Sequence, residues 1–173
     1  MNNTCQFRGI CGYSFVCKND CLVGKRKMNK IRAYMAHPIL GRLGDKATSK
    51  DIEYNIQKAI VASKVLEICI PELEIYCPGE MDEFPQVALW DKKYITLEQL
   101  LDIDCTILAK RDLLLVFDWQ NWVSNGMIEE IMFAKKHGIR MYFFSEICQR
   151  IFDDLKDIVD ELLHEHYNGV QSE

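Results

Sequence analysis

The chain has 173 residues, of which 49% are hydrophobic and 27% are charged, and its formal net charge is -5. This composition excludes an intrinsically disordered chain, and the length suits one main domain with a core of its own. There is no apolar run long enough to cross a membrane and no signal-peptide pattern, so we expect a cytoplasmic protein that makes no membrane contact.

Positive charge gathers at the start of the chain. Residues 1–32 hold seven Lys or Arg against one acidic residue, whereas the rest of the chain is acidic. A basic segment can contact the phosphates of a nucleic acid, but a short run such as GKRKMNK is also typical of a solvated linker, which we favour. We therefore expect a basic head at residues 1–27 and a main domain at residues 28–173.

The head contains four closely spaced cysteines: Cys5, Cys11, Cys17 and Cys21. Cytosolic thiols stay reduced, so the cluster predicts a tetrahedral thiolate site for one structural Zn2+, with no open position for catalysis and no organic cofactor. The segment CQFRGICGYSFVCKNDC resembles a CCCH zinc finger in which Cys21 replaces the histidine. An iron-sulfur cluster uses the same ligands and stays an alternative. The other four cysteines have apolar neighbours and are expected in the core: Cys69, Cys77, Cys105 and Cys148.

The first half of the main domain predicts two strands around one helix. KIRAYMA (30–36) is typical of a buried strand, and a polar, glycine-rich loop follows it. Ser49 is the expected N-cap of a helix with apolar residues at helical spacing, among them Ile52 and Ile56. ELEIYCP (72–78) predicts a second strand that Pro78 ends.

The second half continues the alternation of helices and strands. Thr96 is expected to cap a helix over 96–112, and LLLVFD (113–118) predicts a central parallel strand buried on both faces. A helix beginning near Ser124 leads into the strand IRMYFF (139–144). The last helix is acidic with one apolar stripe, which we expect to pack on the domain or on a twin subunit: Ile147, Ile151, Leu155, Ile158 and Leu162.

Strands that alternate with helices predict an α/β fold, a Rossmann-like (flavodoxin-like) parallel sheet flanked by helices, preceded by the small metal-binding head. Ligands of such sheets bind beyond the carboxyl ends of the strands. We therefore expect the loops after Met35, Tyr76 and Asp118 to surround one cleft.

Two adjacent carboxylates lie in the helix that begins near Ser124. Glu130 shares a helix face with two small residues, Gly126 and Ala134, which leaves room beside its carboxylate. Glu129 shares a face with Lys136 and is expected to meet solvent. Spacing alone also fits two ordinary surface charges, but Glu130 is the better candidate for chemistry.

Three separated motifs resemble the nucleoside 2-deoxyribosyltransferase superfamily, which includes deoxyribosyltransferases and nucleoside 5'-monophosphate N-glycosidases. Tyr34-Met-Ala-His-Pro38 is similar to the family's opening Tyr-Leu-Ala-Gly-Pro, with His37 in place of glycine. Asp104 and Asp112 have the spacing of a pair of aspartates before the central strand. The catalytic signature [DS]-x-G-x-x-x-E-x-G-x-A is matched at Ser124, Gly126, Glu130 and Ala134, with Met132 in place of the second glycine.

The resemblance implies an enzyme that cleaves the N-glycosidic bond of a nucleoside or nucleotide. It makes Glu130 the carboxylate beneath the sugar, where it stabilises or captures the positive charge that develops at C1'. Asp104 would supply a proton to the departing base if burial raises its pKa, and Tyr34 would orient Glu130 by a hydrogen bond. Trp119 and Trp122 are candidates to stack on the base, or they form a hydrophobic lid.

The same resemblance bears on the substrate class. Ser124 is expected to be a helix N-cap; the transferases have Asp there and the monophosphate glycosidases have Ser, which would leave a helix start open to a phosphate. Arg42 is a candidate second phosphate contact. His37 is either a third contact or an ordinary loop residue.

Two functions therefore stay open. The first is a nucleotide N-glycosidase or deoxyribosyltransferase, which the resemblance implies is at least a homodimer, because family members complete each pocket with a neighbouring subunit. The second is a non-catalytic nucleotide-binding or sensor module whose zinc head contacts nucleic acid or a partner. The combination of Tyr34, Asp104 and Glu130 favours the enzyme.

Overall fold

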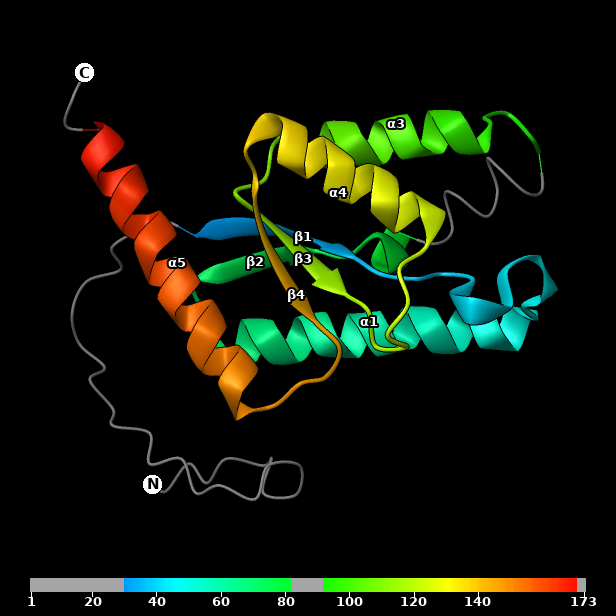
Figure 1. The fold of residues 1–173 in the computed structure, drawn as a ribbon, viewed down its shortest axis with the longest axis horizontal. Helices are drawn as coiled ribbons and strands as arrows, with labels where there is room; N and C mark the ends of the chain where they lie inside the picture. The colour runs from blue at the N-terminus through cyan, green and yellow to red at the C-terminus, as the bar shows by residue number, and fades with distance from the viewer. Residues whose placement is uncertain (1–29, 82–91, 171–173) are drawn as a thin grey trace, which may run out of the picture.

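The computed structural model describes residues 30–81 and 92–170, which alternate strands and helices from end to end (Figure 1). The cysteine head lies outside these residues. The strands are β1 (Ile31–Ala36), β2 (Leu73–Tyr76), β3 (Leu113–Phe117) and β4 (Arg140–Phe144). The helices are α1 (Ser49–Cys69), α3 (Leu97–Leu108), α4 (Asn125–His137) and α5 (Gln149–Val170), with 3-10 helices η1 (Gly41–Lys46) and η2 (Pro78–Met81).

The four strands form one parallel sheet in the order β2-β1-β3-β4. This architecture is the expected α/β fold, and it is consistent with a Rossmann-like sheet flanked by helices. The strand order reverses between β1 and β3, as in the doubly wound order 2-1-3-4-5. The carboxyl ends of β1 and β3 are therefore the place where such a sheet offers a crevice.

The central strand β3 is anchored at its first residues. All five of its residues are buried, as expected for a strand covered on both faces. Just before it, the Asp112 backbone N–H donates to the Arg32 carbonyl at 2.8 Å, and the Arg32 N–H donates to Asp112 Oδ2 at 2.8 Å. Asp112 therefore fixes β3 beside β1 at the end of the sheet opposite the crevice.

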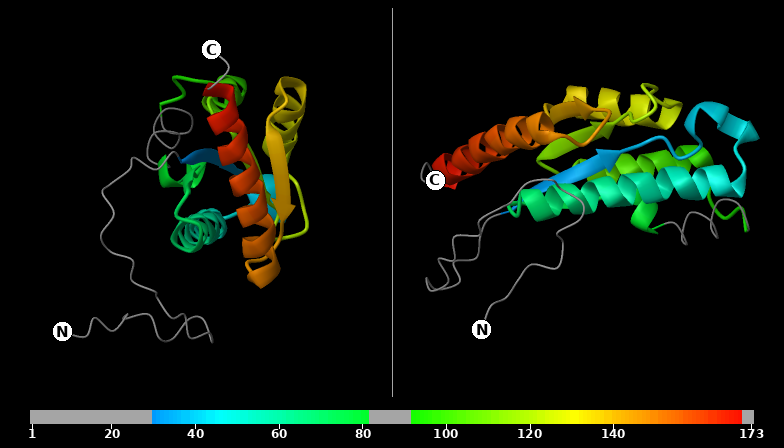
Figure 2. Two further views of the ribbon diagram at one scale, coloured as in Figure 1. Left: turned by 90° about the vertical axis from the view of Figure 1, so that its left-hand side faces the viewer. Right: turned by 90° about the horizontal axis from the view of Figure 1, so that it is seen from below.

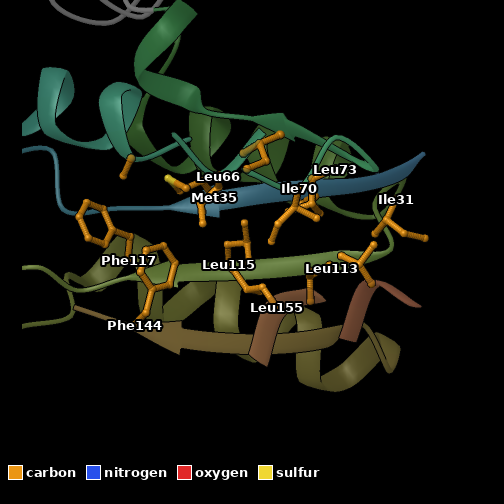
Figure 3. Packing of buried hydrophobic residues seen from close by; sticks show 14 of the residues in the cluster. Ile31, Met35, Leu66, Ile70, Leu73, Leu113, Leu115, Phe117, Phe144 and Leu155 are labelled. Atoms are coloured by element: carbon orange, nitrogen blue, oxygen red, sulfur yellow. The ribbon is translucent and has the colours of Figure 1, made fainter. Parts of the chain in front are cut away.

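One face of the sheet carries a large apolar core between the strands, α1 and α5. Figure 3 shows Leu66 of α1 and Leu155 of α5 against side chains of β1 and β3, and the view from below in Figure 2 shows both helices on this side. The α5 stripe lies inside this core, because Ile151, Leu155 and Leu162 are buried. The stripe therefore packs on the domain itself.

The other face is covered by α3 and α4, which lie side by side in Figure 1. Its core is smaller and contains a tyrosine: Tyr34, Ala36, Leu108, Leu114, Val116, Met127 and Ala134. Side chains alternate along a strand, so Tyr34 points to this face while its neighbours Ala33 and Met35 point to the other.

The helix ends follow the expected capping chemistry with one correction. Thr96 caps α3 and Ser124 caps α4, but Thr48, not Ser49, is the N-cap of α1. Thr48 is the preferred N-cap because Asp51, three residues later, completes a capping box with it. Within the predicted polar loop, residues 41–46 form η1, and Gly41 there has a φ of +60°.

Burial tests the prediction made for the four isolated cysteines. The prediction that all four isolated cysteines lie in the core is wrong for Cys69, which is exposed at the end of α1; Cys77 is buried, and Cys105 and Cys148 are half-buried. Along the described parts of the chain, no helix has both the length and the apolar character needed to cross a membrane.

Candidate active site

A buried hydrogen bond joins β1 to α4 beneath the α3 side of the sheet. The Tyr34 hydroxyl donates to Glu130 Oε1 at 2.6 Å, although the two residues are 96 positions apart in the chain. Tyr34 is fully buried and Glu130 is 6% exposed. A carboxylate is rarely placed in a core, and this one has a short hydrogen bond from a phenol as its partner. The hydrogen bond expected between these residues is therefore present.

Burial shifts the protonation of this cluster. Burial raises the pKa of Glu130 from 4.5 to about 8; the hydrogen bond from Tyr34 opposes this shift, and the negative charge of Asp104 adds to it. Burial also raises the pKa of Asp104 from 3.8 to about 6, against a hydrogen-bonding contribution from Tyr34. Asp104 belongs to α3, so two helices and one strand place their polar groups together. The burial of Asp104 therefore raises its pKa, which is the condition for it to act as a proton donor.

Helix α4 presents its two adjacent carboxylates differently. Glu129 is exposed and Glu130 is buried, so the predicted helix face is right. The room predicted beside Glu130 at Gly126 is not empty, because a Cβ added at Gly126 would lie 3.3 Å from Leu101 Cδ2 of α3. Gly126 thus allows α3 to approach α4 closely, which brings Asp104 toward Glu130.

Ser124 acts as the N-cap of α4, as expected. Its Oγ accepts a hydrogen bond from the Met127 N–H at 3.2 Å. The side chain is half-buried at the start of the helix that carries Glu130. The cap therefore fixes where α4 begins, and Glu130 lies in the second turn that follows.

A separate cavity of about 210 Å3 lies at the crevice between the ends of β1 and β3. The loop after β1, the loop after β3 and the first turns of α1 line it: Leu40, Gly41, Arg42, Leu43, Asp51, Tyr54, Asn55, Trp119 and Gln120. Two predicted site residues, Arg42 and Trp119, meet here. Neither Glu130 nor the described loop after β2 contributes to its lining, so the single cleft expected from the three loops is only partly formed.

The walls of this cavity are cross-linked. The Arg42 backbone N–H donates to Gln120 Oε1 at 2.8 Å, and the Arg42 guanidinium donates to the Asn121 carbonyl at 3.2 Å. Asn55 is buried and donates from Nδ2 to the Ile39 carbonyl at 2.9 Å. A Cβ at Gly41 would come within 2.8 Å of Asn55 Nδ2. The guanidinium of Arg42 therefore has an intramolecular hydrogen-bond partner.

Trp119 packs on the α1 side of the sheet, away from the face that holds Tyr34. Its ring lies edge-on to Tyr54 with centroids 5.6 Å apart, and Lys58 Nζ lies 4.6 Å from its centroid. Its Nε1 is buried and finds no hydrogen-bond partner in residues 30–81 and 92–170. These contacts fit the lid alternative at least as well as stacking on a base. Trp122 is half-buried in the same loop.

His37 is buried at the end of β1. Its Nδ1 lies 3.2 Å from the Met35 carbonyl, and its buried Nε2, beside Gly79, has no hydrogen-bond partner within the described part of the chain. Burial lowers the pKa of His37 to about 4, so the ring is neutral near pH 7. With Nδ1–H donating to the carbonyl, Nε2 offers a lone pair, which suits a hydrogen-bond donor and not a phosphate. The geometry favours the interpretation of His37 as an ordinary loop residue.

Sequence patterns did not single out Asn55, Gln120, Tyr54 or Lys58, although all four lie at or beside the cavity. Only the position of Gln120, directly after a candidate residue in the loop following β3, offered a signal. The α1 residues lie one to three turns into a helix, where polar side chains are ordinary. Their place at the crevice follows from the crossover that brings α1 under the ends of β1 and β3.

The described residues contain no group of three or more His, Cys, Asp or Glu side chains that could hold a metal ion. The predicted ligands Cys5, Cys11, Cys17 and Cys21 lie outside these residues. The described part of the site offers acid-base and nucleophilic groups: a buried glutamate, a phenol and an aspartate of raised pKa.

No protein-family model, curated protein or solved structure matches this chain.

Proposed function

We propose that the protein is a nucleotide N-glycosidase or deoxyribosyltransferase that cleaves the N-glycosidic bond of a nucleoside or nucleoside 5'-monophosphate through Glu130. The observation that carries this proposal is the 2.6 Å hydrogen bond from the buried Tyr34 hydroxyl to Glu130 Oε1, with Asp104 beside it. Burying a carboxylate that has no cationic partner lowers the stability of the fold. Proteins tolerate such a loss of stability mainly at functional sites. The resemblance of the three sequence motifs supports the same chemistry.

Each residue has a role in that reaction. As the bond between the base and C1' breaks, its electron pair leaves with the base, and positive charge develops at C1'. Ionised Glu130 stabilises this charge or bonds to C1', and Asp104 gives its proton to the departing base. Water or an acceptor base then attacks C1' and gives its proton to the Asp104 carboxylate, while any bond between Glu130 and C1' breaks and returns its electron pair to Glu130. The Tyr34 hydrogen bond favours the ionised glutamate and fixes the oxygen that accepts it.

The scheme needs one proton on the pair of carboxyl groups near neutral pH. The two carboxyl groups titrate as a pair, with pKa values of about 6 and about 8. Between these values the pair holds one proton. Because the pKa of Glu130 is the higher of the two, the free protein holds that proton mainly on Glu130. The reactive arrangement, with the proton on Asp104 and the negative charge on Glu130, is therefore the minor form of the singly protonated pair, and substrate binding must favour it.

The test is release of free base from a panel of nucleosides and nucleoside 5'-monophosphates, followed by chromatography. We expect base from at least one member, and we expect Tyr34→Phe to lower kcat by about tenfold or more, because it removes the hydrogen bond while keeping the ring. Tyr142→Phe is the matched control, since Tyr142 donates to Asp154 on the opposite face of the sheet. A panel in which no member releases base would contradict the proposal.

The substrate class is tested by Ser124→Asp. We propose that Ser124 and the start of α4 accept a 5'-phosphate, so wild type prefers monophosphates and the added carboxylate reverses that preference by charge repulsion. Asp is as good an N-cap as Ser, so stability stays nearly unchanged. If wild type prefers nucleosides, or if the ratio of the two rates is the same in the variant, Ser124 is only a cap.

A further inference from the structure

A second tyrosine lies against the Tyr34 ring. Tyr76 of β2 is the direct register partner of Tyr34 across the parallel strands. The two ring centroids are 5.6 Å apart and the ring planes are tilted by 32°. The partner of Tyr34 on its other side is Leu114, an apolar core residue. The orientation of the Tyr34 ring is therefore set by one aromatic and one aliphatic neighbour.

Tyr76 is itself held by a cation. The Arg111 guanidinium carbon lies 5.3 Å from the centroid of the Tyr76 ring. Arg111 Nε is buried and has no hydrogen-bond partner among the described residues, while the guanidinium lies over the ring. The charge of Arg111 lowers the pKa of Tyr76, while burial and the negative charge of Asp104 raise it by more. Tyr76 thus lies within electrostatic reach of both the arginine and the candidate acid.

Exposure distinguishes the two tyrosines. Tyr34 is fully buried and Glu130 nearly so, whereas Tyr76 is half-buried. Tyr76 is therefore the member of the pair that borders solvent. Removing its ring would open a path for water toward the Tyr34 ring and, beyond it, toward Glu130.

We propose that Tyr76, held by Arg111, is a positioning residue that keeps water away from the Tyr34–Glu130 hydrogen bond and keeps the Tyr34 hydroxyl aimed at Glu130. The inference rests on the proposed function for its catalytic consequence, but its physical content concerns the free protein. Burial is the largest cause of the raised pKa of Glu130, so the side chains that exclude water control the titration of this carboxyl. Tyr76 acts through its ring, not its hydroxyl.

The experiment is a pH titration of the Glu130 carboxyl carbon by NMR in protein labelled at glutamate carboxyls, with Glu130→Gln to assign the signal. We expect Tyr76→Ala to lower the pKa of Glu130 by about one unit or more, because the carboxyl regains water. Tyr76→Phe keeps the ring and should leave the titration unchanged. Arg111→Lys, which keeps the positive charge but loses the planar contact with the ring, should give a smaller shift in the same direction.

Tyr142→Ala is the matched control, because Tyr142 is also half-buried on a strand but packs on the α1 and α5 side of the sheet. If Tyr76→Ala is folded and titrates like wild type, or if Tyr142→Ala shifts Glu130 as much, the proposal is overturned. If Tyr76→Ala does not fold, Tyr76→Leu replaces it. This variant keeps an apolar side chain but loses the flat ring, and the same shift in the pKa of Glu130 is measured.

Measuring kcat as well as the Glu130 titration distinguishes a failure of this inference from a failure of the proposed function. If wild type releases base, Tyr76→Ala should lower kcat by about tenfold or more with a much smaller change in KM, since a misplaced catalytic group affects the transition state most. A wild type without activity would overturn the proposed function, while a shifted Glu130 titration in Tyr76→Ala would still support the positioning role.

Discussion

The two faces of the sheet differ in the polarity of the side chains that they bury. The face under α1 and α5 buries a continuous apolar cluster that runs from Ile31 to Leu162. The face under α3 and α4 buries a smaller cluster and places a phenol and a carboxylate inside it. The same four strands supply both faces, because alternate side chains point to opposite sides. The first face therefore stabilises the fold through apolar burial. The second face buries polar groups, which costs stability, but these groups can react.

The largest effect expected on the reactive face is on rate. Glu130→Ala should lower base release by about three orders of magnitude or more, as deletion of a catalytic nucleophile does elsewhere. Glu129→Ala, one residue away on the exposed side of α4, should change the rate little. Steady-state rates of the two variants with the best substrate decide the matter. Equal losses would show that the exposed and buried positions do not differ in function.

The apolar face should lose stability instead. Leu115 is fully buried in the large cluster, so Leu115→Ala should lower the free energy of unfolding by about 2–5 kcal/mol. Leu43→Ala is the control, because Leu43 is 53% exposed and should change stability by less than about 1 kcal/mol. Urea unfolding measures both. A similar loss in the two variants would mean that the large cluster is not the main source of stability.

The reactive face should gain stability when its charge is removed. The folded-state pKa of Glu130 is about 8 against an ordinary value of 4.5, so the folded protein binds a proton more tightly than the unfolded chain does. The contribution of protonated Glu130 to the free energy of unfolding is therefore fully present below pH 4.5, and it is lost as the pH rises toward 8. Glu130→Gln should not lose stability in this way, because glutamine does not ionise.

Thermal unfolding at several pH values checks the sign. We expect Glu130→Gln to match wild type near pH 4 and to exceed it at pH 8 by a few kcal/mol, at about 1.4 kcal/mol for each unit of pKa difference. The same substitution at the exposed Glu129 should show no such trend. A variant that is less stable than wild type at pH 8 would mean that the buried carboxylate stabilises the fold.

Most of the fold could be predicted from the sequence, because it follows from local patterns. The unbroken apolar run before Asp118 predicted the central strand, and Thr96 and Ser124 predicted helix starts. The exceptions are local competitions: Thr48 caps α1 because Asp51 completes its capping box, and Cys69 is exposed because it ends α1 on the outer side. Spacing alone could not decide such cases.

The candidate site was predictable in part. Helical spacing separated Glu130 from Glu129, and the resemblance paired Glu130 with Tyr34 and Asp104. The loops after β1 and β3 border the cavity, as the sequence predicted for a cleft at this edge of the sheet. The α1 wall was not predictable, because Tyr54 and Asn55 reach the cavity through a crossover that no local pattern encodes. The partnership of Tyr76 and Arg111 likewise depends on strand register and on the path of a long side chain.

The pH dependence of kcat/KM tests most directly whether the buried pair of carboxyls is the reacting pair. One limb should fall on the acid side near pH 6 and one on the alkaline side near pH 8, because the reaction needs one ionised and one protonated carboxyl. We predict a bell with its maximum near pH 7, and a single remaining limb in Asp104→Asn. A wild-type profile that is flat from pH 5 to 9, or that is unchanged in Asp104→Asn, would contradict the account.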